Sequence, residues 1–441
     1  MKNFVTVIAI MLLTACMGVK TAWAGGYQLN LSGQRQVGMA YVGTGMPLDL
    51  ATISMNPGGL AALDHNGILL GSNATFINTT FRSNPQMFPV LQGDYEAETD
   101  SRIRTPFSIY AAYETPLENL RAGLGVYTPY GNNVRWDNDW LYAGMLTEIT
   151  MFTIFIQPTL SYSLTERLSV GAGPIFAIGS VNLQRRPTVD LRGVDPNLPQ
   201  DAPLHVELDG STTAFGFNAG LYYEHNDMLS FGVSYRSKVD MELEEGDADF
   251  TLESQQVPAA VAGQLFPPGN TFDASLPLPA VLSLGLGIRP SEVVRIGLDA
   301  NLTFWSEYED LSFDFGINTP AVQDSQEPRN FNDRWIFRVG GEWDATEVLQ
   351  LRLGAYYDMS PVDEGFITPE TPDVDRYGFS AGASVALTPQ MGLNASVLFI
   401  TSSYREQTLE DMNQPGTPAV VPVGEFQTNA LIPGLSFYYN F

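Results

Sequence analysis

The chain has 441 residues, of which 16% are charged and 11% aromatic, and its formal net charge is −27. A surface this acidic repels nucleic-acid phosphates, which excludes nucleic-acid binding as a main role. Beyond the N-terminus no run of about 18 apolar residues occurs, so the sequence predicts no membrane-spanning helix.

Residues 1–24 have the features of a secretory signal peptide. Lys2 provides the basic start, an apolar stretch runs from Phe4 to Leu13, and Ala22-Trp23-Ala24 fits the cleavage pattern of small residues. We therefore expect export through the general secretory pathway and cleavage after Ala24. The alternative is a lipoprotein signal in which Cys16, the only cysteine, carries lipid. Cleavage after Ala24 would leave no cysteine for a disulfide, a metal site or thiol chemistry.

Residues 25–66 differ from the rest of the chain. They contain eight glycines, three formally charged residues and no long alternation of polar and apolar side chains. The segment is too uncharged for a solvated tail, and irregular backbone at membrane depth is tolerated where protein surrounds it. We therefore predict that residues 25–66 form a hatch, or plug, inside the lumen of a barrel built from residues 67–441. A periplasmic extension is the alternative.

From Gly67 onward apolar and polar residues alternate, as strands with one face in lipid and one in the lumen require. Between residues 295 and 305, for example, Leu298 falls on the apolar side and Asp299 on the polar side. Fourteen such segments are joined alternately by short turns and long loops, which predicts an all-β fold, a 14-stranded antiparallel transmembrane β-barrel of a Gram-negative outer membrane. The segments are residues 67–80, 101–115, 119–130, 147–163, 168–185, 205–224, 229–240, 280–289, 294–305, 333–344, 348–358, 376–388, 391–402 and 430–441, and the long loops are 81–100, 131–146, 186–204, 241–279, 306–332, 359–375 and 403–429.

Two further features concern partners in the membrane. The last residues, Leu435 to Phe441, alternate and end in an aromatic residue, which resembles the signal for the barrel assembly machinery. Acidic clusters such as residues 242–249 in the expected loops either keep these loops soluble or bridge through divalent cations to anionic lipopolysaccharide. We expect a monomer surrounded by outer-membrane lipid.

Catalytic motifs are missing from the sequence. The three histidines, His65, His205 and His225, suggest neither a Ser-His pair nor a metal-ligand cluster. No glycine motif for nucleotides follows a strand and opens a helix. We therefore expect no enzymatic activity, no metal and no cofactor.

Several motifs resemble the FadL family of outer-membrane transporters for hydrophobic compounds. Gly26-Tyr27-Gln28-Leu29-Asn30 and Asn56-Pro57-Gly58-Gly59-Leu60 resemble its hatch, with Gly58 where the family usually has alanine. The resemblance implies a 14-stranded barrel plugged by an N-terminal hatch, in agreement with the strand count above. Blocks similar to later family segments follow in the expected order over essentially the whole mature chain, at residues 122–131, 232–237, 303–306, 357–362 and 372–376.

The resemblance also implies a function, the passive uptake of hydrophobic compounds, with long-chain fatty acids first and aromatic or aliphatic hydrocarbons second. The ligand would rest in an external groove between loops, move to a lumen pocket beside the hatch and leave sideways through a kinked third strand. Such an exit spares an alkyl tail exposure to water, which costs about 0.8 kcal/mol per CH₂. Alternatives from other classes are an open polar porin, against which the hatch argues, and a structural or adhesive barrel.

The candidate residues for each step follow from these motifs and from residue chemistry. Asn and Pro suit a tight hatch turn, Gly and Pro interrupt a strand ladder, and exposed apolar loop residues contact either a ligand or a neighbouring loop. The candidates are Asn56, Pro57 and Gly58 for the hatch turn, Gly123, Gly125 and Pro129 for a weakened and kinked lateral-opening strand, Tyr27 and Leu29 for the pocket unless they only pack the plug, and Val261, Leu265 and Phe266 for the external groove.

Basic residues near the expected positions would meet a ligand carboxylate. They are Arg185 or Arg186, at the end of the fifth strand, and Arg329, before the tenth. Glu327 stands where the fatty-acid transporter of the family has a lysine. That departure leaves neutral hydrocarbons as alternative ligands.

Overall fold

The structure, a computed structural model, describes residues 26–83, 94–100, 102–413, 417–418 and 420–441. The expected signal peptide at residues 1–24, with the alternative of a lipidated Cys16, lies outside the described residues. No helix in the described part of the chain is long and apolar enough to cross a membrane.

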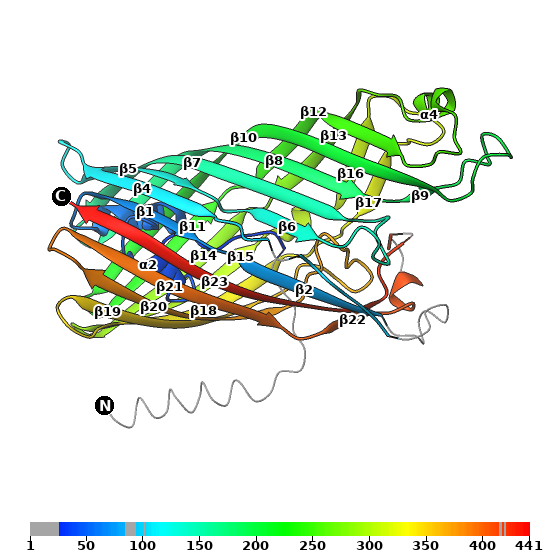
Figure 1. Cartoon of the computed structure of the whole chain (residues 1–441). Coiled ribbons are helices and arrows are strands. Elements are labelled where there is room, and N and C mark those ends of the chain that lie inside the picture. Colours follow the sequence, from blue (N-terminus) through cyan, green and yellow to red (C-terminus); the bar gives the residue numbers. More distant parts are fainter. Residues whose placement is uncertain (1–25, 84–93, 101, 414–416, 419) are drawn as a thin grey trace.

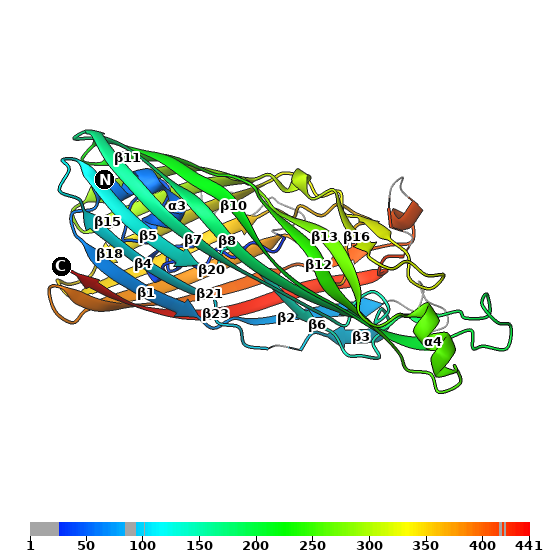
Figure 2. The same cartoon turned by 90° about the horizontal axis from the view of Figure 1, so that it is seen from above.

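The wall of the molecule is one antiparallel sheet that closes on itself. Closure occurs because β1 (Gly67–Asn73), in the first pass of the chain through the wall, pairs with strands on both sides. One partner is β4 (Phe107–Glu114), in the second pass, and the other is β23 (Gly424–Asn440), in the last pass. Fourteen passes of the chain make up this barrel, and a bulge or break divides five of them into two segments. Figures 1 and 2 show the strands running obliquely along its length. The expected 14-stranded antiparallel barrel is confirmed.

The barrel has two ends. Short turns join the strands at one end, which also holds Phe441 and is called the short-turn end, and long connections join them at the other, called the long-loop end. In chain order the passes are β1 (Gly67–Asn73) with β2 (Phe76–Ser83), β4 (Phe107–Glu114), β5 (Leu120–Tyr127) with β6 (Gly131–Arg135), β7 (Glu148–Thr165), β8 (Leu168–Arg185), β10 (Ala202–Asn226), β11 (Leu229–Arg236) with β12 (Val239–Leu252), β13 (Asn270–Leu278) with β14 (Val281–Ser291), β15 (Val294–Thr303) with β16 (Asp310–Phe315), β18 (Arg334–Asp344), β19 (Leu349–Asp358), β20 (Arg376–Ala386), β21 (Met391–Ser402) and β23 (Gly424–Asn440). The long-loop end adds β3 (Tyr95–Glu98), β9 (Thr188–Val189), α4 (Ala259–Leu265), η2 (Trp305–Glu307), β17 (Ser325–Pro328), β22 (Arg405–Gln407) and η3 (Asp411–Asn413).

Alternation along each strand separates an outer from an inner face. On β15, Leu298 points outward and is 41% exposed, whereas the adjacent Asp299 is buried. The Asp299 carboxylate accepts hydrogen bonds from the backbone N–H groups of Gly43 and Thr44, both at 2.9 Å. An apolar outer face suits lipid, and the inner carboxylate is satisfied by the segment that fills the lumen.

The strands extend further at the long-loop end than the sequence predicted. The prediction of a loop at residues 241–279 is wrong over most of that range, because strands β12 and β13 occupy much of it. Only residues 253–269, which include α4, connect the two strands. Alternation persists on β12, where Met241 and Leu243 are buried and Glu242 and Glu244 are exposed. The outer face here is acidic rather than apolar, which is why the sequence pattern suggested a loop. Conversely, β4 begins at Phe107 and not at residue 101.

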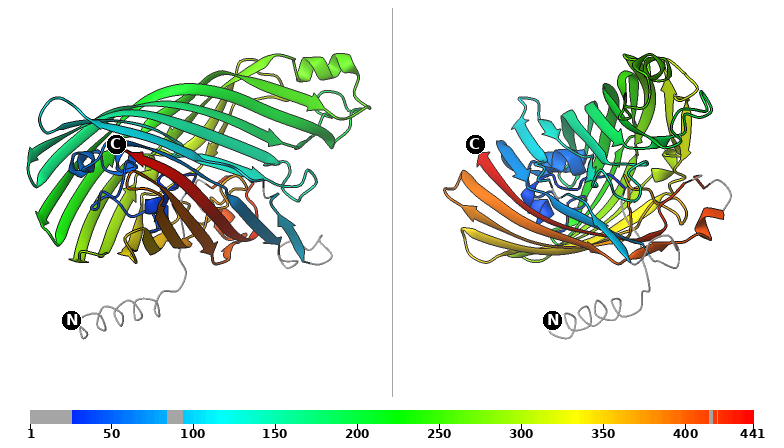
Figure 3. Two further views of the ribbon diagram at one scale, coloured as in Figure 1. Left: turned by 60° about the vertical axis from the view of Figure 1, so that its left-hand side comes forward. Right: turned by 45° about the vertical axis from the view of Figure 1, so that its right-hand side comes forward.

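Residues 26–66 lie within the barrel at its short-turn end, where Figure 3 shows them in blue between the strands. They form three short helices, α2 (Gln34–Val37), α3 (Thr52–Met55) and η1 (Pro57–Ala62). Inward-facing glycines of the wall permit their close approach. A Cβ atom at Gly171 would collide with the carbonyl of Pro57, and one at Gly232 would collide with that of Thr44.

A charge on the outer face tests the assignment of this face to lipid. Replacing Leu298 with Arg should lower the free energy of unfolding in lipid vesicles by about 2–4 kcal/mol, the cost of an arginine near the bilayer midplane. Leu298→Ile keeps the surface apolar and should cost less than about 1.5 kcal/mol. Urea titration of both variants measures the difference, and equal unfolding energies would contradict the assignment.

Candidate functional site

The hatch turn is fixed to the barrel wall by its own polar groups. Asn56 is fully buried, and its side-chain amide donates to the carbonyls of Thr44 (2.8 Å) and Leu221 (3.0 Å) and accepts from the N–H of Gly58 (3.1 Å). The carbonyl of Gly58 in turn accepts from the hydroxyls of Ser161 and Ser169 on β7 and β8. Asn56, Pro57 and Gly58 therefore lie together against the wall, as one connected turn.

The third pass is interrupted between β5 and β6, at residues 128–130. The ladder of β5 is complete at Gly123 and Gly125, which pair with both neighbouring strands. A Cβ atom at Gly123 would press on Ile53 of the hatch, and one at Gly125 would meet Tyr110 of β4 first and Ile53 next. Of the three residues expected to weaken this strand, only Pro129 lies at the interruption. Gly123 makes room for the hatch, and Gly125 makes room for Tyr110 of the wall as well as for the hatch.

The N-terminal residues of the hatch pair with the interrupted strand. Leu29 N–H donates to the carbonyl of Pro129 (2.8 Å), and Gly131 N–H donates to the carbonyl of Tyr27 (3.0 Å). Gln28 and Tyr130 form an antiparallel bridge between them. Among the described residues, β6 forms a ladder only with β7. Tyr27–Leu29 therefore occupy an edge that β4 leaves open.

An apolar pocket of about 620 Å³ lies beside Tyr27, toward the long-loop end. The Tyr27 hydroxyl donates to the carbonyl of Pro277 (2.6 Å), and its ring packs edge-on against Trp305 at 4.8 Å. Tyr27 thus forms one side of the pocket. The other lining residues are Asn132, Ile149, Met151, Val181, Leu183, Leu208, Leu243, Phe272, Ala274, Ser275, Leu276, Tyr308, Leu311, Phe313, Glu370 and Thr371.

Two further cavities adjoin this pocket. The wall cavity, about 700 Å³, contains Leu29, Ile77, Val134, Ile400 and Ala430 and shares Tyr27, Asn132, Glu370 and Thr371 with the apolar pocket. The outer vestibule, about 1180 Å³, opens at the long-loop end and also contains Glu370. Its remaining lining residues are Leu141, Tyr142, Gly144, Met145, Arg185, Pro187, Thr188, Gln326, Glu327, Pro328, Arg329, Thr368, Pro418 and Val420.

The charges where the vestibule meets the pocket balance one another. Arg185 donates to Glu327 at 2.7 Å, and Arg329, only 1% exposed, donates to Glu327 at 3.0 Å and to Glu370. Burial opposes ionisation of Glu327, but the two guanidinium groups hold the pKa of this extramembrane carboxyl below its ordinary value. Two arginines thus meet two carboxylates. Arg186 lies apart from this cluster, paired with Glu253 at 3.0 Å.

The apolar loop residues lie on and just after α4. Leu265 and Phe266 are buried, and Phe266 stacks on Phe250 with ring centroids 6.2 Å apart. The hydroxyl of Thr319 donates to the carbonyl of Leu265. Val261 is partly buried against the same core. These contacts agree with the alternative that the apolar residues of this loop pack against a neighbouring loop. None of the three residues lines the cavities described above.

Sequence reasoning missed Glu370, Trp305 and Tyr308. Glu370 and Tyr308 lie in long connections without alternation, where no periodic signal marks an inward side chain. Trp305 ends the expected segment 294–305 on the same side as Asp299, but the alternation does not show that it packs against Tyr27. Tyr27, which contacts Trp305 and Tyr308, is hundreds of residues away from them along the chain. Among the described residues, no group of three His, Cys, Asp or Glu side chains could hold a metal ion.

A closed barrel with a filled lumen and apolar cavities defines a class of protein, the outer-membrane channels for hydrophobic molecules. Residues 15–441 match the family described as outer membrane protein transport protein (OMPP1/FadL/TodX), and the chain belongs to this family. The expected FadL-family membership and outer-membrane location are confirmed. Members of this family are transport channels and not enzymes.

Similar proteins cover nearly the whole chain. The 47 kDa outer membrane protein of Pasteurella multocida is 25% identical over 96% of this chain and 95% of its own. The long-chain fatty acid transport protein of Salmonella typhi is 21% identical over 90% and 92%. A Pseudomonas aeruginosa FadL homologue has a TM-score of 0.80 at 20% identity, covering 95% and 100% of the two chains, and the Pseudomonas putida toluene transporter TodX has 0.70 at 16%, covering 94% and 99%. These likenesses to solved structures support the fold.

Removal of the Asn56 side chain tests the hatch turn. Asn56→Ala removes the side-chain partner of two buried groups, the carbonyl of Thr44 and the N–H of Gly58, which costs about 1–3 kcal/mol. Amide hydrogen exchange in residues 54–60 should therefore accelerate by roughly tenfold to a hundredfold. Asp64→Ala, an exposed change in the same segment, is the control and should leave exchange unaltered. Equal exchange in the two variants would remove the anchoring role of Asn56.

Proposed function

We propose that this protein lets hydrophobic compounds pass the outer membrane passively, with long-chain fatty acids as the first substrate class. The ligand enters the outer vestibule, moves into the apolar pocket, and leaves through the wall cavity beside β6. One observation carries the proposal. The hatch residues Tyr27–Leu29 both line the inner cavities and cover the interrupted third strand.

A sideways exit is favoured by the polarity around Tyr27. The wall cavity offers Leu29, Ile77, Val134 and Ile400 to an alkyl chain. A second cavity between the hatch and the wall is lined mainly by polar residues and includes two arginines but no carboxylate, whereas Arg376 in the wall cavity is paired with Asp373. Leaving the apolar surroundings costs free energy in proportion to the apolar area exposed. The filled lumen argues against an open polar porin.

Fatty acids come first because the curated relatives include proteins named long-chain fatty acid transport proteins. Neutral hydrocarbons are the second candidate, supported by the charge balance at the pocket. Arg185 and Arg329 already have carboxylate partners, so a ligand carboxylate would compete with Glu327 and Glu370 for them. Solved structures of similar fold include toluene transporters.

Replacing Glu327 tests how the charge cluster selects ligands. Glu327→Gln leaves Arg185 and Arg329 with Glu370 as their only carboxylate within the cluster. Affinity for oleate, relative to that for oleyl alcohol, should rise on the order of tenfold, the contribution of a hydrogen bond to a charged group. Glu253→Gln, which frees only Arg186, is the matched control. An unchanged ratio, measured by calorimetry on the purified protein, would exclude ligand carboxylates from this cluster.

Locking the hatch N-terminus onto the third strand tests the route. Gln28 and Tyr130 face each other as a non-hydrogen-bonded antiparallel pair, because the hydrogen bonds join the residues on either side of them. The Cα atoms of such a pair lie about 4.5 Å apart, which is within the range for a disulfide. The variant Gln28→Cys/Tyr130→Cys should take up labelled oleate slowly when oxidised and several-fold faster after reduction. Reduction supplies the matched control in the same molecule. Equal uptake in both states would show that ligand does not pass this segment.

A further inference from the structure

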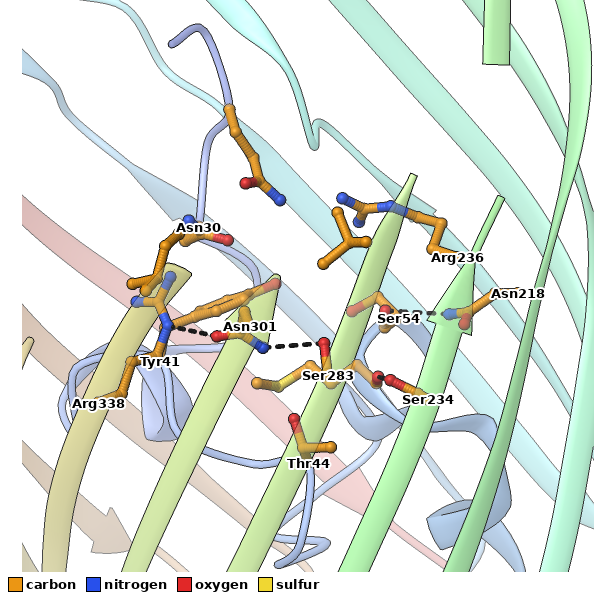
Figure 4. A pocket seen from close by; sticks show the side chains of 14 residues that line it. Asn30, Tyr41, Thr44, Ser54, Asn218, Ser234, Arg236, Ser283, Asn301 and Arg338 are labelled. Carbon is orange, nitrogen blue, oxygen red and sulfur yellow. Dashed lines mark hydrogen bonds between the residues drawn. The ribbon is translucent and has the colours of Figure 1, made fainter. Parts of the chain in front are cut away.

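A polar cavity of about 460 Å³ lies between the hatch and the barrel wall (Figure 4). It carries two arginines, Arg236 and Arg338, and no carboxylate belongs to its lining. The other lining residues are Gln28, Asn30, Tyr41, Thr44, Ser54, Met55, Asn218, Ser234, Val281, Ser283, Asn301 and Ile336.

Arg236 has no anionic partner. Its Nη2 donates to the hydroxyl of Tyr130 at 3.1 Å, and its guanidinium lies 5.3 Å from the centre of that ring. The Nε atom is buried without a hydrogen-bond partner in the described part of the chain. No ion pair within 4.0 Å among the described residues involves Arg236, and the remaining residues of the sequence contain no Asp or Glu. A guanidinium enclosed by protein ordinarily has a carboxylate or phosphate opposite it.

Arg338, across the cavity, is held by neutral groups. Its Nε donates to Asn301 at 2.9 Å and its Nη1 to the carbonyl of Ala40 at 3.0 Å. The rings of Tyr41 and Tyr356 lie against it. Asp299 and Asp358 act on it through space, but neither lies within ion-pair distance among the described residues. The cavity therefore carries two positive charges and a lining of neutral hydroxyl and amide groups.

We propose that this polar cavity binds a carboxylate, with Arg236 as its principal partner and Arg338 as a second positive charge. The carboxylate belongs either to a small free anion or to the head of an amphipathic ligand. Gln28 lines both this cavity and the wall cavity, so the chain of an amphipathic ligand with its head here would have to pass Gln28 to reach the wall. Only this second source rests on the function proposed above. The anion site itself does not.

Matched ligands of equal chain length test the site. Octanoate and 1-octanol are titrated by calorimetry into the full-length protein in detergent, in which Arg236 is native, changed to Gln or changed to Lys. Octanoate should bind the native protein about tenfold more tightly than 1-octanol, as expected for a charged hydrogen bond. Arg236→Gln should bring this ratio close to one, and Arg236→Lys should restore part of it. The control Arg289→Gln removes an exposed arginine paired with Glu224 and should keep the native ratio.

Acetate identifies the source of the carboxylate. Competition by acetate in the native protein but not in Arg236→Gln assigns the site to small free anions, and competition by octanoate alone assigns it to the head of an amphipathic ligand. Heat-dependent mobility in gels confirms that each variant keeps a folded barrel. An octanoate preference that survives in folded Arg236→Gln would overturn the proposal. In that case 1-octanol binding and oleate uptake still report on the transport route, so the anion site and the transport function can be refuted independently of each other.

Discussion

An irregular chain inside a membrane barrel must find a hydrogen-bond partner for every backbone group that it buries, and this requirement shapes the lumen. Side chains on the inner face of the wall supply these hydrogen-bond partners to individual hatch residues. Ser234 donates to the carbonyl of Met55, Ser230 to that of Gly45, and Asn218 to that of Ser54. Asp299 accepts the two N–H groups at Gly43 and Thr44. Much of the lumen's polarity therefore serves the hatch rather than a water-filled path.

The two ends of the hatch are held by different forces. Near the short-turn end, Arg35 forms an ion pair with the fully buried Glu342, which also binds Arg295 and Arg352 of the wall. Separating one partner from such a buried cluster costs several kcal/mol. At the other end, residues 27–29 are held by a short bridge, by the Tyr27 hydroxyl and by ring contacts. Displacing these few residues would leave the charged anchor untouched.

The sequence predicted the barrel well because a lipid-facing strand has to alternate. On β15 the inward Asp299 and outward Leu298 follow that rule directly. The pattern failed on β12, where water replaces lipid outside and acidic residues take the outer positions. Local patterns also give no account of what faces Gly123 and Gly125: Gly123 lies against Ile53 of the hatch, and Gly125 lies against both Tyr110 of β4 and Ile53. The Glu370–Arg329 pair had no sequence signal, since only the closed fold brings these residues together.

The length of β10 has a consequence for where capture takes place. Its 25 residues span about 80 Å along the strand, whereas the apolar band of an outer-membrane barrel is about 25 Å tall. Even with a tilt near 40°, the rim formed by β8, β10, β12 and β13 rises far past the lipid on one side (Figure 1). On the proposed route, a hydrophobic ligand would therefore leave water at a distance from the membrane that the length of these strands sets, whatever side chains line the cavities inside.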